Sequence, residues 1–459
     1  MAESSLQQQP QGGQYKAAER LENPAKTLEK SLQDLAKVGG FEFVESSIEG
    51  SKNLNPTRKA LKNIFLTEKD KKADRQALKK RLALWMNLIN ESADINEMVE
   101  KATERGAKAE EELKKNLKTA HDAARELETA YRSTALFYAN TDSQKLKNIT
   151  VVSAAMEDLQ NLDNPTTINY IREELNKNYD RLDLRDNYSI LAIPGYLGSN
   201  MVLNEWAKVA HDNKVMLVTD FADMDSVDEV VDVFESKNHT SSDMYKSNVM
   251  MACNWLVGRG KNAAVGEETD VMVPPSSALA GKLYTTLMSQ VTAGVKFGGL
   301  DQVEGVKFEL KKSEIGELDR MGLIPMVNEF GKVMAFSSKT LFDGDNLGLQ
   351  TYSVVRVFDY INKTLIDFLN RRAFENWTSL TEKDLREQIV KFLNRIQGPT
   401  KLIERFRIER LEQDEEQKDR IHLDIHITPY FPAKSFMLKL DGTKGTSGEN
   451  NWETKTEQQ

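Results

Sequence analysis

The spacing of apolar residues predicts helices in the first third of the chain. Leucines recur at helical intervals over 25–38, which predicts a short amphipathic helix. The helical pattern returns over 68–139, and Thr67 with Asp70 resembles a capping box at its start. Gly106 lies within this zone. Because glycine weakens a helix, we expect Gly106 to divide the zone into two helices.

Strand and helix patterns alternate in the middle of the chain. Short apolar runs predict strands at 149–152, 188–193, 215–218, 306–310 and 333–336. Helical patterns occupy 202–211, 227–234 and 242–256. The order strand, helix, strand over 188–218 predicts a βαβ unit.

The pattern is clearest near the C-terminus. Apolar positions line one helical face over 354–369, and a second helix is expected over 382–396, capped by Thr381 and Asp384. A β-hairpin is expected at 405–428, since apolar and polar residues alternate there. Its apolar face is formed by six residues: Phe406, Ile408, Ile421, Leu423, Ile425 and Ile427. Such a one-sided strand pair packs on its own domain and leaves its other face in solvent.

Together these patterns predict an α/β (α+β) chain with a helical N-terminal region and a C-terminal element of two helices and a hairpin. The expected segments are a flexible arm with a short helix (1–55), a helical domain (56–146), an α/β domain (147–350), C-terminal helices and hairpin completing it (351–440), and a flexible tail (441–459). The arm and the tail are polar and cannot bury enough surface to order themselves.

Composition narrows the class of protein. The 459 residues carry a formal net charge of −9, which argues against a nucleic-acid partner. One cysteine permits no intramolecular disulfide. No apolar run is long enough to span a membrane, and the N-terminal residues lack the basic and apolar regions of a signal peptide. We therefore expect a cytoplasmic protein without membrane insertion.

The turn after the expected strand 188–193 is the best candidate for a phosphate cradle. It reads Pro194-Gly195-Tyr196-Leu197-Gly198-Ser199-Asn200 and leads into an expected helix. It lacks the lysine and hydroxyl of a P-loop and the glycine spacing of a dinucleotide fingerprint. A plain strand-to-helix turn is favoured, and no nucleotide cofactor is expected.

Candidate metal ligands and nucleophiles are weak. His422 and His426 share a strand face with Asp424, but side chains four apart in a strand are about 13 Å apart and cannot share one ion. Cys253 lies in an apolar stretch for which we expect a helix. A cysteine buried in such a stretch is usually an unreactive residue of the core. We expect no catalytic residue, no metal and no cofactor, which favours a structural role.

Two stretches of the chain carry a family resemblance. The first reads Leu127-Glu128-Thr129-Ala130-Tyr131-Arg132-Ser133. It is similar to the Glu-x-x-Trp-Arg-Gly-Leu motif of the large contractile-sheath subunit of type VI secretion systems (TssC), with Tyr131 in place of tryptophan. The second extends over 318–327 and resembles that family's Leu-x-x-x-Gly-Phe-Ile-Pro-Leu segment, through Gly322 and Pro325.

Two further stretches resemble phage tail sheath proteins. The run Val273-Pro274-Pro275-Ser276-Ser277-Ala278-Leu279-Ala280-Gly281 is similar to their Pro-Pro-Ser…Ala-Gly segment. The stretch 428–433 resembles their closing Pro-x-x-Pro-Ala-Glu, with Lys434 in place of the acid. The combined resemblance covers about 125–440 of the chain.

The resemblance implies a structural subunit without catalysis. It implies that a small TssB-like subunit pairs with this chain, that the pairs stack as a helical sleeve of many copies around an Hcp-like inner tube above a baseplate, and that contraction drives secretion. A Clp-type AAA+ ATPase then dismantles the sleeve. The hairpin at 405–428 would accept strands from neighbours, and the helix at 25–38 either docks the ATPase or packs locally.

Two alternatives remain open at the level of sequence. One is the sheath of another phage-tail-like contractile injection machine. The other, from a different class, is an α/β enzyme acting on a nucleotide or sugar-phosphate. A sheath subunit should form large assemblies, whereas an enzyme should be a small oligomer whose melting temperature rises with its ligand.

Overall fold

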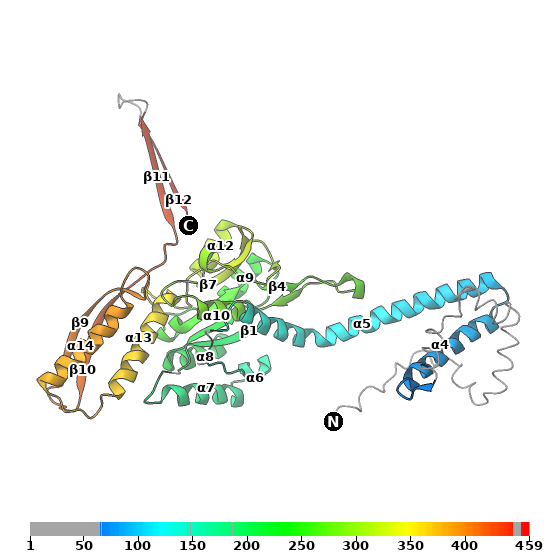
Figure 1. The fold of residues 1–459 in the computed structure, drawn as a ribbon. Helices are drawn as coiled ribbons and strands as arrows, with labels where there is room; N and C mark the ends of the chain where they lie inside the picture. Colours follow the sequence, from blue (N-terminus) through cyan, green and yellow to red (C-terminus); the bar gives the residue numbers. More distant parts are fainter. Residues whose placement is uncertain are drawn as a thin grey trace, which may run out of the picture. The chain divides into compact units, whose positions relative to one another are not determined.

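A computed structural model describes residues 65, 67–144, 146, 148–185, 187–443 and 451–458. The arm and the helix expected at 25–38 lie outside these residues. The chain forms two compact units, Met1–Thr119 and Ala120–Gln459, and each is described separately below (Figure 1).

Helix α4 (Lys72–Glu91) and the start of helix α5 (Ile95–Ala139) form the described part of the first unit. The expected break at Gly106 is wrong, because that glycine lies inside α5. The helices separate at Ser92–Asp94 instead, where the Asp94 carboxylate accepts the Glu97 amide at 2.9 Å and the Glu97 carboxylate accepts the Ala93 amide at 2.5 Å. This reciprocal capping decides the break, and a single helical glycine costs only about 1 kcal/mol.

The capping box expected at Thr67 and Asp70 is also wrong. Helix α4 begins at Lys72, and the residue at its N-cap, Lys71, makes no side-chain cap hydrogen bond.

A five-stranded sheet forms the centre of the second unit, with strand order β1-β2-β3-β7-β8. The strands are β1 (Ile190–Tyr196), β2 (Met216–Asp220), β3 (Val249–Cys253), β7 (Leu323–Glu329) and β8 (Lys332–Ala335). The first four are parallel, and β8 is antiparallel to β7. Helix α8 (Asn200–Asp212) joins β1 to β2, which confirms the predicted βαβ unit.

The two faces of this sheet bury separate cores, because successive strand residues point to opposite faces. On β2, Leu217 belongs to one core and Met216 and Val218 to the other. The first core also contains residues of α6 (Met156–Gln160), α7 (Thr166–Tyr179), α8, α9 (Val227–Lys237) and α12 (Lys312–Arg320). The second contains residues of α5, α10 (Ser276–Thr285), α13 (Tyr352–Asn370), β4 (Leu256–Arg259), β5 (Val271–Val273) and β6 (Gly305–Val306).

Three predictions for the middle of the chain are wrong. The stretch 242–256 is not a helix but contains the 3-10 turn η3 (Met244–Asn248), strand β3 and the start of β4. Strand β3 is buried on both faces, so its apolar run shows no alternation and resembles a buried helix. The run 149–152 has no strand, and the strand expected at 306–310 is reduced to β6.

A third core joins the C-terminal helices to a hairpin. Helices α13 and α14 (Ser379–Ile396) pack with strands β9 (Ile403–Gln413) and β10 (Ile421–Pro429), as predicted. The cap of α14 is Thr378, whose Oγ1 accepts the amide of Thr381 at 3.1 Å. The expected cap was therefore three residues too late. Two short elements, η4 (Ala263–Val265) and α11 (Gly294–Phe297), complete the described helices.

The expected loose tail at 441–459 is also wrong in its described part. Strands β11 (Phe436–Thr443) and β12 (Asn451–Gln458) form an antiparallel pair there. The polar composition of β12 concealed it, since threonine and tryptophan favour strands even when a segment is largely polar.

The crossing of α5 and α10 requires a glycine. A Cβ built on Gly281 would lie 2.5 Å from the carbonyl oxygen of Phe137, closer than any real contact. We expect Gly281→Ala to lower the free energy of unfolding by about 1–3 kcal/mol, because backbone must move to admit the methyl group. Gly106→Ala is the matched control: its added Cβ meets nothing within 4 Å, so it should raise stability by roughly 0.5–1 kcal/mol. Urea unfolding of both variants tests this, and equal effects would contradict it.

Candidate functional site

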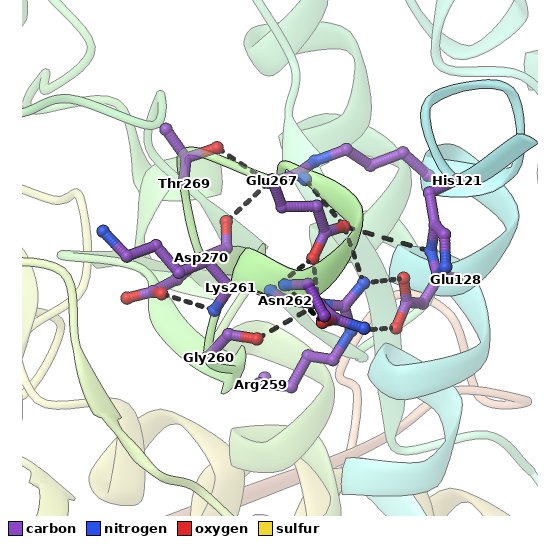
Figure 2. A network of polar contacts seen from close by, with 12 residues as sticks. His121, Glu128, Arg259, Gly260, Lys261, Asn262, Glu267, Thr269 and Asp270 are labelled. Carbon is purple, nitrogen blue, oxygen red and sulfur yellow. Dashed lines mark hydrogen bonds and ion pairs between the residues drawn. The ribbon is translucent and has the colours of Figure 1, made fainter. Parts of the chain in front are cut away.

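One face of α5 is tied to the loop between β4 and β5 by a network of ion pairs (Figure 2). Its central residues are Glu128 and Arg132 on α5 and Arg259 and Glu267 at the ends of that loop. We call these four residues the α5 brace. Arg132 and Glu128 are one helical turn apart, so both point to the same side of α5.

Arg259 is the centre of the α5 brace. Its Nε and Nη2 donate to the two carboxylate oxygens of Glu128 at 2.6 and 2.8 Å. Its Nη1 and Nη2 donate to the two oxygens of Glu267 at 2.6 and 2.9 Å. One guanidinium thus binds two carboxylates in a bidentate manner, the strongest geometry available to a protein ion pair.

Part of this ion-pair network is buried. Glu267 is only 8% exposed, and it also accepts the amide of Asn262 at 2.8 Å. Arg125, one turn before the brace on α5, donates to the carbonyl oxygen of Asp270 at 2.5 Å. The loop is therefore held to α5 at Glu267 and Asp270 as well as at Arg259.

The brace predicts a particular acid sensitivity. The hydrogen bonds from Arg259 lower the pKa of Glu128 and of Glu267 from 4.5 to about 2. Because the folded-state pKa values are depressed, the stabilisation is present above about pH 4.5 and is lost as the pH falls towards 2. We expect thermal unfolding of Glu128→Gln to depend less on pH in this window than that of the parent chain. Parallel pH profiles would contradict the assignment.

The family-like motif on α5 has a physical explanation in this geometry. Arg132 donates its Nε to Glu128 at 2.9 Å and its Nη1 to the carbonyl oxygen of Gly258 at 3.1 Å. Ser133 forms a 2.6 Å hydroxyl pair with Ser277 of α10. Tyr131 is 70% exposed and lies outside the brace, so Glu128 and Arg132 are brought together while Tyr131 is left on the surface.

Gly322 and Pro325 lie elsewhere, Gly322 between α12 and β7 and Pro325 inside β7. Gly322 follows the helix with φ +90°, and a Cβ there would lie 3.0 Å from the carbonyl oxygen of Thr340. Only glycine adopts this conformation without strain. Pro325 lies within β7, where its carbonyl oxygen accepts the amide of Phe336 at 3.0 Å. Both residues shape the sheet rather than a binding site.

The six residues of the predicted apolar hairpin face differ in whether they pack against the third core. Five of the six pack against the third core: Phe406, Ile408, Leu423, Ile425 and Ile427. Ile421 is 37% exposed and is not part of this core. A register shift between Asp424 and Ile425 separates the two parts of β10.

Two strand pairs of the C-terminal region have open edges. Apart from a single bridge between Gln397 and Ile403, strands β9 and β10 pair only with each other among the residues that the structure describes. The same holds for β11 and β12. Open edges present unpaired backbone donors and acceptors, which a strand from another chain can complete.

An acidic side chain of the chain occupies the phosphate cradle that was considered at 194–200, whose Gly195 lies near the end of β1. The carboxylate of Asp220, at the end of β2, accepts the amide of Gly195 at 2.8 Å and the amide of Ser276 at 2.8 Å. Burial raises the pKa of Asp220 to about 7. A carboxylate thus occupies the amide that a phosphate would need, which disfavours the nucleotide reading of this turn.

The histidines and the cysteine are placed as ordinary structural residues. His422 lies 2.6 Å from Asp414, measured from Nε2 to a carboxylate oxygen. Cys253 is buried in β3, and burial raises the pKa of its thiol well above the usual range. In the described ranges no group of three or more potential metal ligands is found, nor a helix long and apolar enough to cross a membrane.

Three family models match successive parts of the chain. The model described as "Type VI secretion system TssC/VipB, central domain" matches residues 119–343. The model of the TssC/VipB-like N-terminal region matches 28–117, and that of the C-terminal domain matches 351–458. No curated protein matches the chain.

The chain is also similar to chains in solved structures of contractile systems. A chain of the anti-feeding prophage baseplate is 17% identical, with 69% of this chain and 81% of that chain covered and a TM-score of 0.48. A chain of the PVC sheath complex, an extracellular contractile injection system in its contracted state, is 14% identical, with 70% and 82% covered and a TM-score of 0.47. The contracted anti-feeding prophage sheath is 17% identical, with 68% and 81% covered and a TM-score of 0.47.

Proposed function

Since the chain belongs to the TssC/VipB family of the type VI secretion system, we propose that it is the large subunit of a contractile sheath that pairs with a small TssB-like subunit. Sheath subunits associate with copies of themselves in a helical lattice. The observation that supports a stitching role here is the pair of two-stranded sheets, β9–β10 and β11–β12, each with open edges among the described residues.

Burial shows which part of the hairpin packs within the chain. The apolar face of β9–β10 is occupied by the third core, so its edges, not its face, remain for neighbours. Strand addition uses main-chain hydrogen bonds and tolerates sequence change. Heterologous contacts generate helical polymers when they do not close on themselves.

The proposal extends to the remaining partners. We expect the lattice to enclose an Hcp-like inner tube, to start from a baseplate in the cytoplasm, and to be dismantled by a Clp-type AAA+ ATPase. The role is structural, and no enzymatic step is proposed for the chain. The helix expected at 25–38, which lies outside the described residues, is the candidate dock for the ATPase.

Co-expression tests the proposal. The chain is expressed with the small protein encoded beside it, and the pelleted lysate is imaged by negative-stain electron microscopy. Hollow tubes that require both proteins are the expected result. A soluble monomer or dimer with and without the partner would contradict it and would favour the α/β enzyme. A chain truncated after residue 402 is the control, because it lacks both strand pairs and should form no tubes.

A further inference from the structure

A cavity of about 370 Å³ lies beside the amino ends of β1 and β2. Its wall includes Leu184, Arg185, Asn187 and Ser189 before β1, Lys214 before β2, and Arg356, Asp359 and Lys363 of α13. A cavity of this volume is within the usual range for small-ligand sites. It is remote in sequence from the β9–β12 strands and from the α5 brace.

Two buried cations line this cavity. Arg356 is 6% exposed and Lys363 is 8% exposed, and such residues are almost never buried without a partner of opposite charge. Arg356 donates its Nη2 to the carbonyl oxygen of Leu283 at 3.0 Å, whereas its Nη1 has no hydrogen-bond partner within the described chain. The Nζ of Lys363 donates to the carbonyl oxygens of Tyr188 and Lys214, both at 2.8 Å. Carbonyl groups satisfy these donors but leave their charges uncompensated.

The charges around the cavity do not balance. Two of the lining residues are neutralised by neighbours, since Arg185 pairs with Asp183 and Asp367 pairs with Arg371.

Among the lining residues that the structure describes, the charged ones that remain are Lys214, Arg356 and Lys363, which face one acidic residue, Asp359. Three positive charges and one negative charge leave a surplus of two. Burial lowers the pKa of Lys363 to about 8 and that of Arg356 to about 10, the direction expected for cations that are removed from water.

We propose that this cavity binds a phosphate or phosphate-ester dianion. A phosphate group carries close to two negative charges at neutral pH and offers three acceptor oxygens, which matches both the charge surplus and the number of cationic side chains that line the cavity. The three cations come from two different elements, the turn before β2 and helix α13, so they can approach a tetrahedral group from different sides. The proposal does not depend on the sheath role.

Calorimetric titration of the purified full-length chain with inorganic phosphate at pH 7.5 tests the proposal. A reference titration with sodium chloride at the same ionic strength accompanies it, because phosphate also acts on proteins by being excluded from their surface. We expect saturable binding that Lys214→Gln weakens about tenfold, the loss typical of one charge-assisted contact. Lys214 is partly exposed with φ 52°, and glutamine adds no backbone strain because both side chains carry a Cβ. Lys391→Gln, on the exposed face of α14, is the matched control and should bind as the parent does.

Three results would overturn the proposal. The first is a parent chain that takes up no phosphate in a saturable manner. The second is equal affinity in Lys214→Gln and Lys391→Gln, with both variants shown to be folded by circular dichroism. The third is malonate binding as tightly as phosphate, which would mean that the cavity selects charge and not the phosphate group. Tube formation by these variants is unaffected in any case, so failure here is distinguishable from failure of the sheath assignment.

Discussion

Leu423→Asp should abolish tube formation while leaving most of the chain folded. Leu423 lies opposite Leu411 in the β9–β10 ladder, and Leu411 is only 3% exposed. Both strands pack on α13 and α14 through the third core. A carboxylate at this position would lie among apolar side chains, at a cost of about 1–3 kcal/mol for the unpaired polar group and more if it stays charged. The hairpin should then detach from its helices.

The rest of the fold should tolerate this change, because the first two cores lie on the faces of the five-stranded sheet and share no residue with the third. Co-expression with the small partner and negative-stain imaging gives the readout, with circular dichroism to confirm that helix content is kept. Full-length tubes from Leu423→Asp would show that the hairpin has no part in assembly.

Ile421→Asp is the matched control for this experiment. Ile421 lies on the same strand, is 37% exposed and is outside the third core. If only packing matters, this variant should assemble as the parent chain does. Loss of tubes in both variants would instead place the Ile421 end of β10 in direct contact with a neighbour.

The elements that were predicted well are those in which the apolar residues follow one dominant spacing along the sequence. Apolar and polar residues alternate along β10 because most of its apolar residues pack against the third core while the residues between them are polar. Helix α13 shows a clear helical stripe because one of its sides is buried. The βαβ unit was recognisable because α8 separates two short apolar runs. When an element is buried on one side only, its apolar residues recur at a regular spacing that can be recognised in the sequence.

The failures have the opposite cause. Strand β3 is buried on both faces, so its composition carries no period and was taken for a helix. Strand β12 is polar except for Trp452, so its sequence resembles that of a loose tail. The break between α4 and α5 depends on Asp94 and Glu97 capping each other, which outweighs the weak signal of Gly106.

The α5 brace could not be predicted from local sequence patterns, for a different reason. Glu128 and Arg132 were singled out only by the family resemblance, and their partner Arg259 was missed. The two ends of the Glu128–Arg259 pair are 131 residues apart in the chain. No local pattern links them, since Arg259 ends a short strand between two glycines. The only available signal is that a charged residue ends an otherwise apolar strand.

Arg259→Met should destabilise the second unit strongly. The substitution leaves two carboxylates, those of Glu128 and Glu267, without their shared guanidinium. Glu267 is 8% exposed, and the arginine that would remain beside it, Arg125, lies farther away, with its Nη1 at 3.7 Å from the carboxylate. Breaking a buried ion pair by removing one partner costs about 3–5 kcal/mol, and we expect a loss in the free energy of urea unfolding near the lower end of that range because Glu128 is partly exposed.

Arg407→Met provides the matched control, since Arg407 pairs with Glu409 on an exposed face and such pairs contribute at most about 1 kcal/mol. A double-mutant cycle sharpens the test. If Arg259 and Glu128 act through each other, Arg259→Met with Glu128→Gln should cost less than the sum of the two single changes. A loss below about 1 kcal/mol for Arg259→Met, or strict additivity with Glu128→Gln, would mean that the brace does not stabilise the isolated chain. The Glu-x-x-x-Arg pair of α5 would then have to act between subunits, where only the assembled lattice would reveal its effect.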